Sequence, residues 1–270
     1  QKYLGVDKIY YLDDCVEPLV YLKEIIKNKK INCIHSHGYY PDKFSSGLNN
    51  IKKISTIHSM FYKDYPKEYG RVKGFFGAYS HFKILKRGSF DYTVGCSKSV
   101  SEYCMNHGVK DNIYTINNGV DHNVFKRLSE QEKYKARAEL NIIASRIFIY
   151  SGRFIRRKRV PELLKLCLDN SQGSDLLILL GDGPQRKKCE ALCANNTIRF
   201  LGQVSNPEKF YQISDFVISN SDSEGYPMSI IEAVSCGCYA LLSNIPSHEE
   251  FISQNPKLAS LLDFSNEVDE

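Results

Sequence analysis

Residues 216–233 read FVISNSDSEGYPMSIIEA, and this stretch decides the fold. The apolar run Phe216–Ser219 predicts a buried strand, the polar segment after it predicts a loop, and Met228–Ser235 predicts a helix that begins after Pro227. A strand that ends in a polar loop and returns through a helix is the repeating unit of a parallel α/β sheet. Ligands bind beyond the carboxyl ends of such strands, so the loop at 220–227 is a candidate binding segment.

The same alternation extends through the second half of the chain. Further strands are predicted at Ile147–Ser151, Asp175–Leu180, Ile198–Phe200 and Tyr239–Ser243, with helices at Val160–Leu168, Gln185–Ala194 and Pro207–Ile213. Strands that alternate with helices in this way predict a doubly wound domain around a parallel sheet.

The first half of the chain repeats the pattern less regularly. Short strands are predicted at Ile31–His35, Lys53–His58, Asp91–Cys96 and Ile113–Ile116. Ser97 has the residue type of a helix N-cap, which predicts a helix from there through Cys104.

The segment Asp121–Arg146 is polar and rich in helix-forming residues, and it separates the two runs of strands. We interpret it as the connection between two domains, residues 1–125 and residues 126–270. Both are expected to be Rossmann-like, doubly wound α/β domains that face a shared cleft.

Composition narrows the classes of function. Of the 270 residues 42% are hydrophobic and 25% are charged, which is ordinary for a globular protein and excludes a disordered or collagen-like chain. The net charge of +5 suits phosphorylated small molecules or an anionic membrane face better than duplex DNA.

The nine scattered cysteines predict reduced thiols and a cytoplasmic protein. No Cys-x-x-Cys pair occurs, and we expect no metal site.

Two of the cations that follow the predicted strand Ile147–Ser151 are candidate ligands. Arg153 and Lys158 lie five residues apart on a loop, where both could hold a diphosphate above the strand ends. The alternative is a solvated basic loop. After the next strand, Gly183 would let the backbone approach a ligand closely, although a structural turn accounts for it equally well.

A second anion site is expected at the helix that begins after Pro227. Free amides of Met228 and Ser229 would face the cleft, with the positive end of the helix dipole behind them. Glu232 could accept hydrogen bonds from a ribose diol, and Glu224 could contact a sugar hydroxyl. The alternative for this pair is a helix-capping acid and a surface acid.

These motifs resemble glycosyltransferase family 4, the retaining sugar transferases of the GT-B fold. The resemblance runs from Ile31 to Glu249 and is more specific in the second half. Its motifs are Arg153 with Lys158, Gly181–Pro184, Phe200–Gly202, Glu224 with Glu232, Thr56–His58, Ser97 and Asn118–Asp121.

The resemblance implies a role for each matched position. The donor diphosphate would be held by Arg153, Lys158 and the Met228 and Ser229 backbone, the ribose by Glu232, and the base by the segment from Ile198 to Val204. Glu224 would touch the donor sugar, and His58 would lie over that sugar near the reacting carbon.

Two features depart from the family pattern. No glycine-rich loop precedes Ile31, and the final strand and crossover helices of the family do not follow Glu249. We therefore expect a GT-B fold that is incomplete at both ends.

The resemblance implies transfer of a sugar from a UDP- or GDP-linked donor to a hydroxyl, with retention of configuration. A setting in bacterial surface polysaccharide, lipopolysaccharide or glycolipid biosynthesis is expected, with a glycan or lipid-linked glycan as the acceptor. Cations and helix amides can stabilise a departing diphosphate, and no Asp-x-Asp pair occurs, so neither a metal nor another cofactor is expected.

Two alternatives stay open. A nucleotide-sugar isomerase of the same architecture would use the donor without an acceptor. A non-catalytic nucleic-acid binder is suggested by the basic charge and by the 18 Tyr and 14 Phe. No RNA-recognition signature supports that binder, and we expect no nucleic-acid partner.

Three further histidines and one aromatic segment complete the candidates. His35 and His37 end a strand on one face, where an acceptor-side or structural role is favoured over metal binding. His248 is expected in a loop that could face the cleft. The basic, aromatic stretch Phe61–Arg87 predicts either peripheral contact with an anionic inner membrane or aromatic side chains that pack inward.

Overall fold

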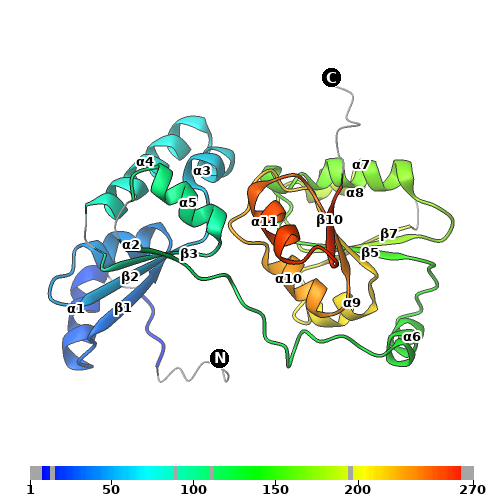
Figure 1. Ribbon diagram of the computed structural model, residues 1–270, viewed down its shortest axis with the longest axis horizontal. Coiled ribbons are helices and arrows are strands. Elements are labelled where there is room, and N and C mark those ends of the chain that lie inside the picture. Colours follow the sequence, from blue (N-terminus) through cyan, green and yellow to red (C-terminus); the bar gives the residue numbers. More distant parts are fainter. Residues whose placement is uncertain (1–7, 13–15, 88–89, 110–111, 194–196, 263–270) are drawn as a thin grey trace.

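A computed structural model of the chain describes residues 8–12, 16–87, 90–109, 112–193 and 197–262. It is an α/β protein with two parallel sheets, one in each of two lobes (Figure 1). Within these ranges no helix combines the length and the apolarity that crossing a bilayer requires.

The N-terminal lobe is built around a four-stranded sheet. Its elements are α1 (Pro18–Asn28), β1 (Cys33–His37), α2 (Tyr39–Ser46), β2 (Lys52–Ile57), α3 (Phe61–Tyr69), α4 (Arg71–Lys86), β3 (Tyr92–Gly95), α5 (Lys98–Asn106) and β4 (Ile113–Thr115).

The rest of the described chain forms the connection and the C-terminal lobe with its six-stranded sheet. The elements are α6 (Glu130–Glu139), β5 (Ile147–Ser151), the 3-10 helix η1 (Arg156–Lys158), α7 (Val160–Asn170), β6 (Leu176–Leu180), α8 (Arg186–Ala191), β7 (Ile198–Gly202), α9 (Pro207–Ile213), β8 (Phe216–Ser219), α10 (Met228–Ser235), β9 (Tyr239–Leu242), α11 (Pro246–Gln254) and β10 (Ala259–Leu261).

The N-terminal sheet has the order β1-β2-β3-β4. Ser36, Ser55 and Thr93 lie side by side in register and are buried, so they mark one face of this sheet. Helix α2 covers that face, because the Ser36 hydroxyl donates to the carboxylate of Asp42. Side chains alternate along a strand, so His35 and His37 of β1 lie on the opposite face, and both are exposed.

The C-terminal sheet has the order β10-β9-β8-β5-β6-β7, and every recorded pair is parallel. The direction of winding reverses between β5 and β8. In open α/β sheets this reversal leaves a crevice at the carboxyl ends of the two strands, where ligands bind. The doubly wound domain expected from the sequence is confirmed here.

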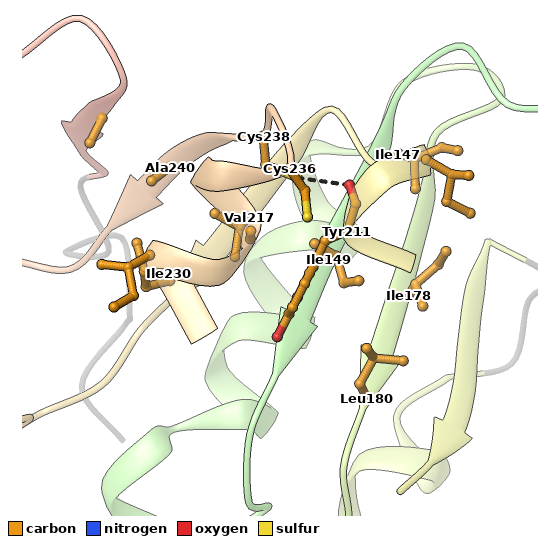
Figure 2. Packing of buried hydrophobic residues seen from close by; sticks show 14 of the residues in the cluster. Ile147, Ile149, Ile178, Leu180, Tyr211, Val217, Ile230, Cys236, Cys238 and Ala240 are labelled. Atoms are coloured by element: carbon orange, nitrogen blue, oxygen red, sulfur yellow. Dashed lines mark hydrogen bonds between the residues drawn. The ribbon is translucent and has the colours of Figure 1, made fainter. Parts of the chain in front are cut away.

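The C-terminal sheet is buried on both faces, which holds its strand ends in place. Every residue of β6, Leu176–Leu180, is buried. Figure 2 shows one of the two packed faces, where Tyr211 of α9 lies among Ile149, Ile178 and Val217. The Cys238 thiol donates to the Tyr211 carbonyl at 3.2 Å. Close packing on both sides leaves the loops at the strand ends on a rigid support.

The connection between the lobes contains α6, which packs against the C-terminal lobe. A capping box begins the helix, with Ser129 and Glu132 hydrogen-bonded to each other's backbone. Lys133 and Arg137 form ion pairs with Asp215 at 2.7 Å and 2.8 Å.

Several elements have the bounds expected from the sequence: β5, α9, β8 and α10. Ser97 is the N-cap of α5, since its side chain accepts from the Val100 amide. The expectation for His248 was wrong, because it lies inside α11 and is buried. Pro246 begins that helix, and proline in a first turn is a signal that the sequence did contain. The cysteines in the described ranges are free thiols, and Cys15 lies outside those ranges.

Candidate functional site

The loops that follow β5 and β8 flank the crevice of the C-terminal sheet. The first contains Arg153 and leads into η1 with Lys158; the second contains Glu224 and leads into α10. These loops come from neighbouring strands of the sheet, which brings together residues that are far apart in the sequence.

Glu224 is the centre of a buried polar cluster between these loops. Its carboxylate contacts the Lys158 ammonium, lies 3.3 Å from Arg157 Nη1 and accepts from the Ser221 hydroxyl at 2.7 Å. Arg157 also donates to the carbonyl of Ser223. The predicted diphosphate ligand Lys158 and the predicted sugar ligand Glu224 are therefore in direct contact.

The charges around Glu224 decide its protonation. Burial by itself would raise the pKa of this carboxyl group, but the positive charges of Lys158 and Arg157 and its hydrogen bonds outweigh burial. The net shift of the pKa is downward, so Glu224 is ionised at neutral pH. An ionised carboxylate is a hydrogen-bond acceptor, which suits contact with sugar hydroxyls.

A cavity of about 360 Å³ opens at the ends of β5 and β6, and Arg153 in its lining lies on the same loop that leads to Lys158. The residues of the Glu224 cluster do not themselves line it. Its lining residues are Ser151, Gly152, Arg153, Leu180, Gly181, Asp182, Gln203, Val204, Pro207, Tyr211 and Glu232. Arg153, predicted to hold the diphosphate, and Glu232, predicted to hold the ribose, thus line one cavity, together with Val204 of the predicted base pocket.

Glu232 is half-buried on α10, and the Tyr211 hydroxyl donates to it at 3.4 Å. Burial raises the pKa of Glu232, and the hydrogen bond from Tyr211 opposes that shift only in part. A carboxylate in this position can accept from a diol. Its predicted contact with a ribose stays a prediction.

The N-terminus of α10 presents its first amides near the Glu224 loop. No side chain caps the helix at Pro227. The first hydrogen bond within the helix is that of the Ile230 amide, which donates to the Pro227 carbonyl at 3.0 Å. The first amides of a helix have no partner within the helix, so those of Met228 and Ser229 can bind an anion.

Glycines allow close packing of the loops around the cavity. A Cβ atom on Gly181 would lie 2.0 Å from the Gly152 carbonyl oxygen, so only glycine fits between the loops after β5 and β6. Gly183 packs against the backbone of Phe154, where a Cβ would lie 2.6 Å from the carbonyl oxygen. Gly183 therefore has a packing role, and its contact with a donor stays a prediction.

His58 follows β2 in the N-terminal lobe and pairs with another histidine. His58 Nε2 lies 2.9 Å from His37 Nδ1, and the His37 ring is 4.4 Å from that of His35. Burial and then the neighbouring histidines lower the pKa of His58 below 6.5. The ring is therefore neutral at physiological pH and can act as a hydrogen-bonding group. No three His, Cys, Asp or Glu side chains in the described ranges gather to hold a metal ion.

The two lobes touch at the Glu224 loop itself. Gly225 packs against His58 so closely that a Cβ atom would lie 1.9 Å from the His58 carbonyl oxygen. The Ser97 hydroxyl donates to the Gly225 carbonyl at 2.7 Å. The histidine predicted to lie over the donor sugar and the glutamate predicted to touch that sugar therefore belong to adjoining backbone segments.

Residues that sequence reasoning did not single out also join the lobes. Glu250 of α11 accepts from the Lys98 and Ser99 amides at 2.8 Å and caps α5 from the other lobe. Glu68 of α3 lies 3.0 Å from Arg153, and Lys67 lies 2.9 Å from Asp222. Figure 1 shows α3 and α5 on the side of the N-terminal lobe that faces α11. These acids carry no local motif, so the sequence offered no signal for them.

Two family models match the chain, one for each lobe. The model described as "Glycosyl transferases group 1" matches residues 130–260, and the model described as "Glycosyltransferase Family 4" matches residues 13–124.

Curated relatives are similar to this chain over most of its length. The O-antigen biosynthesis glycosyltransferase WclY of Escherichia coli is 28% identical over 86% of this chain and 66% of its own length. The capsular polysaccharide biosynthesis glycosyltransferase CapH of Staphylococcus aureus is 25% identical over 90% of this chain and 68% of its own length. The chain thus spans about two thirds of the length of these relatives.

Solved structures share the fold. Sucrose-phosphate synthase from Thermosynechococcus elongatus has a TM-score of 0.76 at 21% identity, over 92% of this chain and 64% of that one. Anabaena Alr3699/HepE in complex with UDP has a TM-score of 0.75 at 16% identity, over 91% of this chain and 68% of that one.

Proposed function

The chain belongs to glycosyltransferase family 4, and from that premise we propose that it transfers a sugar from a nucleoside diphosphate sugar to a hydroxyl group. The observation that carries this proposal is the contact of Lys158 and Arg157 with Glu224, on loops that also lead to a cavity lined by Arg153 and Glu232. Cations, free helix amides and an ionised acid lie around one site, and this set of groups suits a diphosphate joined to a sugar.

The proposed donor is a UDP- or GDP-linked sugar. The Anabaena relative of known structure binds UDP, which favours a uridine nucleotide as the first candidate. The base would occupy the cavity next to Val204, the ribose would reach Glu232, and the diphosphate would lie between Arg153, Lys158 and the amides of α10.

The proposed reaction retains the configuration of the anomeric carbon. Glu224 is the acid proposed to contact the sugar, and it is held by two cations, which makes it a poor nucleophile. We therefore favour attack on the same face from which the diphosphate departs, with a leaving phosphate oxygen accepting the proton of the acceptor hydroxyl. His58 would position the sugar by hydrogen bonding, because its lowered pKa keeps it uncharged.

Stabilisation of the leaving diphosphate is proposed to require no metal ion. Arg153, Lys158 and the first amides of α10 supply positive charge where negative charge develops. Removal of one such preorganised donor lowers the rate of reaction roughly 10²–10³-fold.

The proposed acceptor is a glycan or a lipid-linked glycan, and the proposed setting is cytoplasmic surface-polysaccharide or glycolipid assembly. The names of the curated relatives favour this setting, since they refer to O-antigen and to capsular polysaccharide. An isomerase would need no acceptor, and none of the observations on this site favours it.

Binding of the donor nucleotide is the first test. A nucleotide that binds only the folded chain raises its melting temperature, so UDP, GDP, ADP and their sugars are screened by thermal shift. We expect at least one of these nucleoside diphosphates to stabilise the chain. If none of them does so at millimolar concentration, the proposed donor site is wrong.

Turnover of the donor is the second test. Release of the nucleoside diphosphate is measured for Arg153→Ala and Glu224→Ala, with Arg127→Ala as a matched control, because Arg127 is exposed and pairs with Glu130 outside the site. We expect losses of about 10²-fold in the first two variants. Unchanged donor turnover in both would contradict the assignment.

A further inference from the structure

Helix α4 carries apolar side chains on two neighbouring faces, one buried and one exposed. One face is buried and includes Ala78, Phe82 and Leu85. Gly74 on this face packs directly on α3, where a Cβ atom would lie 2.3 Å from the Pro66 backbone. The burial of this face accounts for how α4 is held in the lobe.

The neighbouring face of α4 is exposed although it is apolar. It consists of Val72, Phe75, Phe76 and Tyr79, each of which is between 53% and 69% exposed. The spacing of three, four and seven residues places these side chains in one stripe along the helix. A contiguous stripe of large apolar side chains on the surface is unusual for a protein without a partner there, so this stripe marks an interaction surface.

Positive charge surrounds the stripe. Residues 71–90 contain the cations Arg71, Lys73, Lys83, Lys86 and Arg87 and no Asp or Glu. Lys83 and Lys86 continue the stripe by one further helical turn after Tyr79. A second copy of this chain would bring like charges together, whereas a surface of anionic headgroups is attracted to all of them.

We propose that this surface, which we call the α4 face (Val72, Phe75, Phe76 and Tyr79 with Lys73, Lys83 and Lys86), binds peripherally to an anionic lipid bilayer. Aromatic rings enter the boundary between headgroups and acyl chains, and the ammonium groups remain with the phosphates. Both interactions occur at the surface of the bilayer, so this mode of binding does not require a membrane-spanning segment.

The position of the α4 face relates membrane binding to the site. Helix α3 begins just after His58, and α4 packs on α3. From α3, Lys67 and Glu68 reach the C-terminal lobe at Asp222 and Arg153. A bilayer bound to α4 would therefore lie on the lobe that carries His58. Delivery of a lipid-linked acceptor to that lobe rests on the proposed function, whereas the binding of lipid does not.

Sedimentation with vesicles tests the proposal. The chain is mixed with vesicles of phosphatidylcholine alone or of phosphatidylcholine with phosphatidylglycerol, at low and at high salt. We expect the chain to sediment with the anionic vesicles, and to do so less at high salt because salt screens the attraction.

Two variants of the α4 face and two matched controls complete the design. Val72→Ser with Phe76→Ser removes exposed apolar groups, and Lys73→Gln with Lys83→Gln removes charge; each should lower vesicle affinity by about fivefold or more. The controls are Tyr134→Ser with Ile143→Ser and Lys135→Gln with Lys187→Gln, which change exposed side chains outside the α4 face. The controls should sediment as the original chain does.

Three outcomes would overturn the proposal. The chain does not sediment with anionic vesicles at low salt, the α4 variants sediment as well as the controls, or light scattering shows a dimer that Phe76→Ser abolishes. Stabilisation by UDP, measured without vesicles, should be equal in all variants. A chain that binds UDP but not vesicles would contradict only this inference. A chain that binds vesicles but not UDP would contradict only the proposed function.

Discussion

The hydroxyl oxygen of Ser97 lies 2.7 Å from the carbonyl oxygen of Gly225 and donates a hydrogen bond to it. Ser97 is also the N-cap of α5, because its oxygen accepts from the Val100 amide at 3.1 Å. One buried hydroxyl therefore both begins a helix of the N-terminal lobe and fixes the loop of the C-terminal lobe that carries Glu224. The catalytic arrangement that we propose depends on this contact between lobes.

Replacement of Gly225 by alanine is expected to separate the lobes. The new Cβ atom would lie 1.9 Å from the backbone oxygen of His58, and a backbone atom cannot rotate away as a side chain can. Donor turnover should fall by about tenfold or more, while UDP affinity, which depends on the C-terminal lobe, should change little. Small-angle scattering should report a larger radius of gyration.

Gly119→Ala is the control for this substitution. Gly119 lies between β4 and α6, and a Cβ atom added there would have no neighbouring atom within 4 Å, so alanine fits. Full turnover in Gly225→Ala, or an equal loss in Gly119→Ala, would contradict the role of the lobe contact.

Replacement of Glu68 by glutamine is expected to strengthen nucleotide binding. The Glu68 carboxylate lies 3.0 Å from Arg153 and competes with a diphosphate for the same guanidinium group. Exposed ion pairs contribute at most about 1 kcal/mol, so the dissociation constant of UDP should fall by up to about fivefold. Calorimetry at low salt measures this change.

Glu130→Gln provides a matched comparison, because Glu130 forms an exposed pair of the same 3.0 Å length with Arg127. This variant should bind UDP as the original chain does. Weaker UDP binding in Glu68→Gln would show that Glu68 supports the site and does not compete for Arg153.

Replacement of His37 by glutamine is expected to raise the pKa of His58. Burial is the largest cause of the lowered pKa, and the charge of His37 is the next. Removal of His37 therefore moves the pKa back toward 6.5, and His58 becomes charged at a higher pH than before. Titration of the His58 ring protons by NMR measures the shift.

His35→Gln should move the pKa of His58 in the same direction by a smaller amount, since His35 has a weaker influence. As the pH is lowered, the turnover of His37→Gln should therefore begin to fall at a higher pH than the turnover of the original chain does. A pKa of His58 that is unchanged or lower in His37→Gln would contradict the pairing.

The buried His248 is expected to make the protein sensitive to acid. Its Nδ1 donates to the Ser243 carbonyl at 2.9 Å, and burial lowers its pKa from 6.5 to about 4. The unfolded chain thus binds a proton that the folded chain does not, so stability is lost as the pH falls from 6.5 to about 4. The contribution is about 3 kcal/mol of the free energy of unfolding.

His248→Asn retains a donor for Ser243 but does not titrate. Urea unfolding at a series of pH values should therefore show a smaller loss of stability in this variant between neutral pH and pH of about 4. Phe251→Leu, on the same buried helix, should lower stability at every pH and keep the original slope. Equal slopes in His248→Asn and the original chain would exclude the contribution.

Local patterns in the sequence predicted much of the C-terminal sheet. The strand Phe216–Ser219 and the helix Met228–Ser235 have the expected bounds, because an apolar run ends in polar turn residues and a proline precedes the helix. Strand β10 was not predicted, since its three residues Ala259–Leu261 are too few to form a pattern. Helix α2 was missed as well, because Pro41 near its start and its polar residues do not suggest a helix.

The candidate site was predictable where its residues follow neighbouring strands. Lys158 and Glu224 come after β5 and β8, and parallel strands bring their carboxyl ends to one edge, so their contact follows from the strand order. Arg157 was not singled out, although it contacts the same carboxylate, because four adjacent cations give no indication of which one faces inward.

The sequence by itself determined the class of fold and the family, because strand ends, helix starts and the spacing of Glu224 and Glu232 are local features of the chain. Only the tertiary structure decided which partners these residues have. Glu68 with Arg153 and Glu250 with the amides of α5 join residues that are far apart in the chain, at 85 and 152 positions. Such contacts depend on how the two lobes meet. A contact between lobes produces no hydrophobic periodicity in either segment, so the sequence alone does not indicate it.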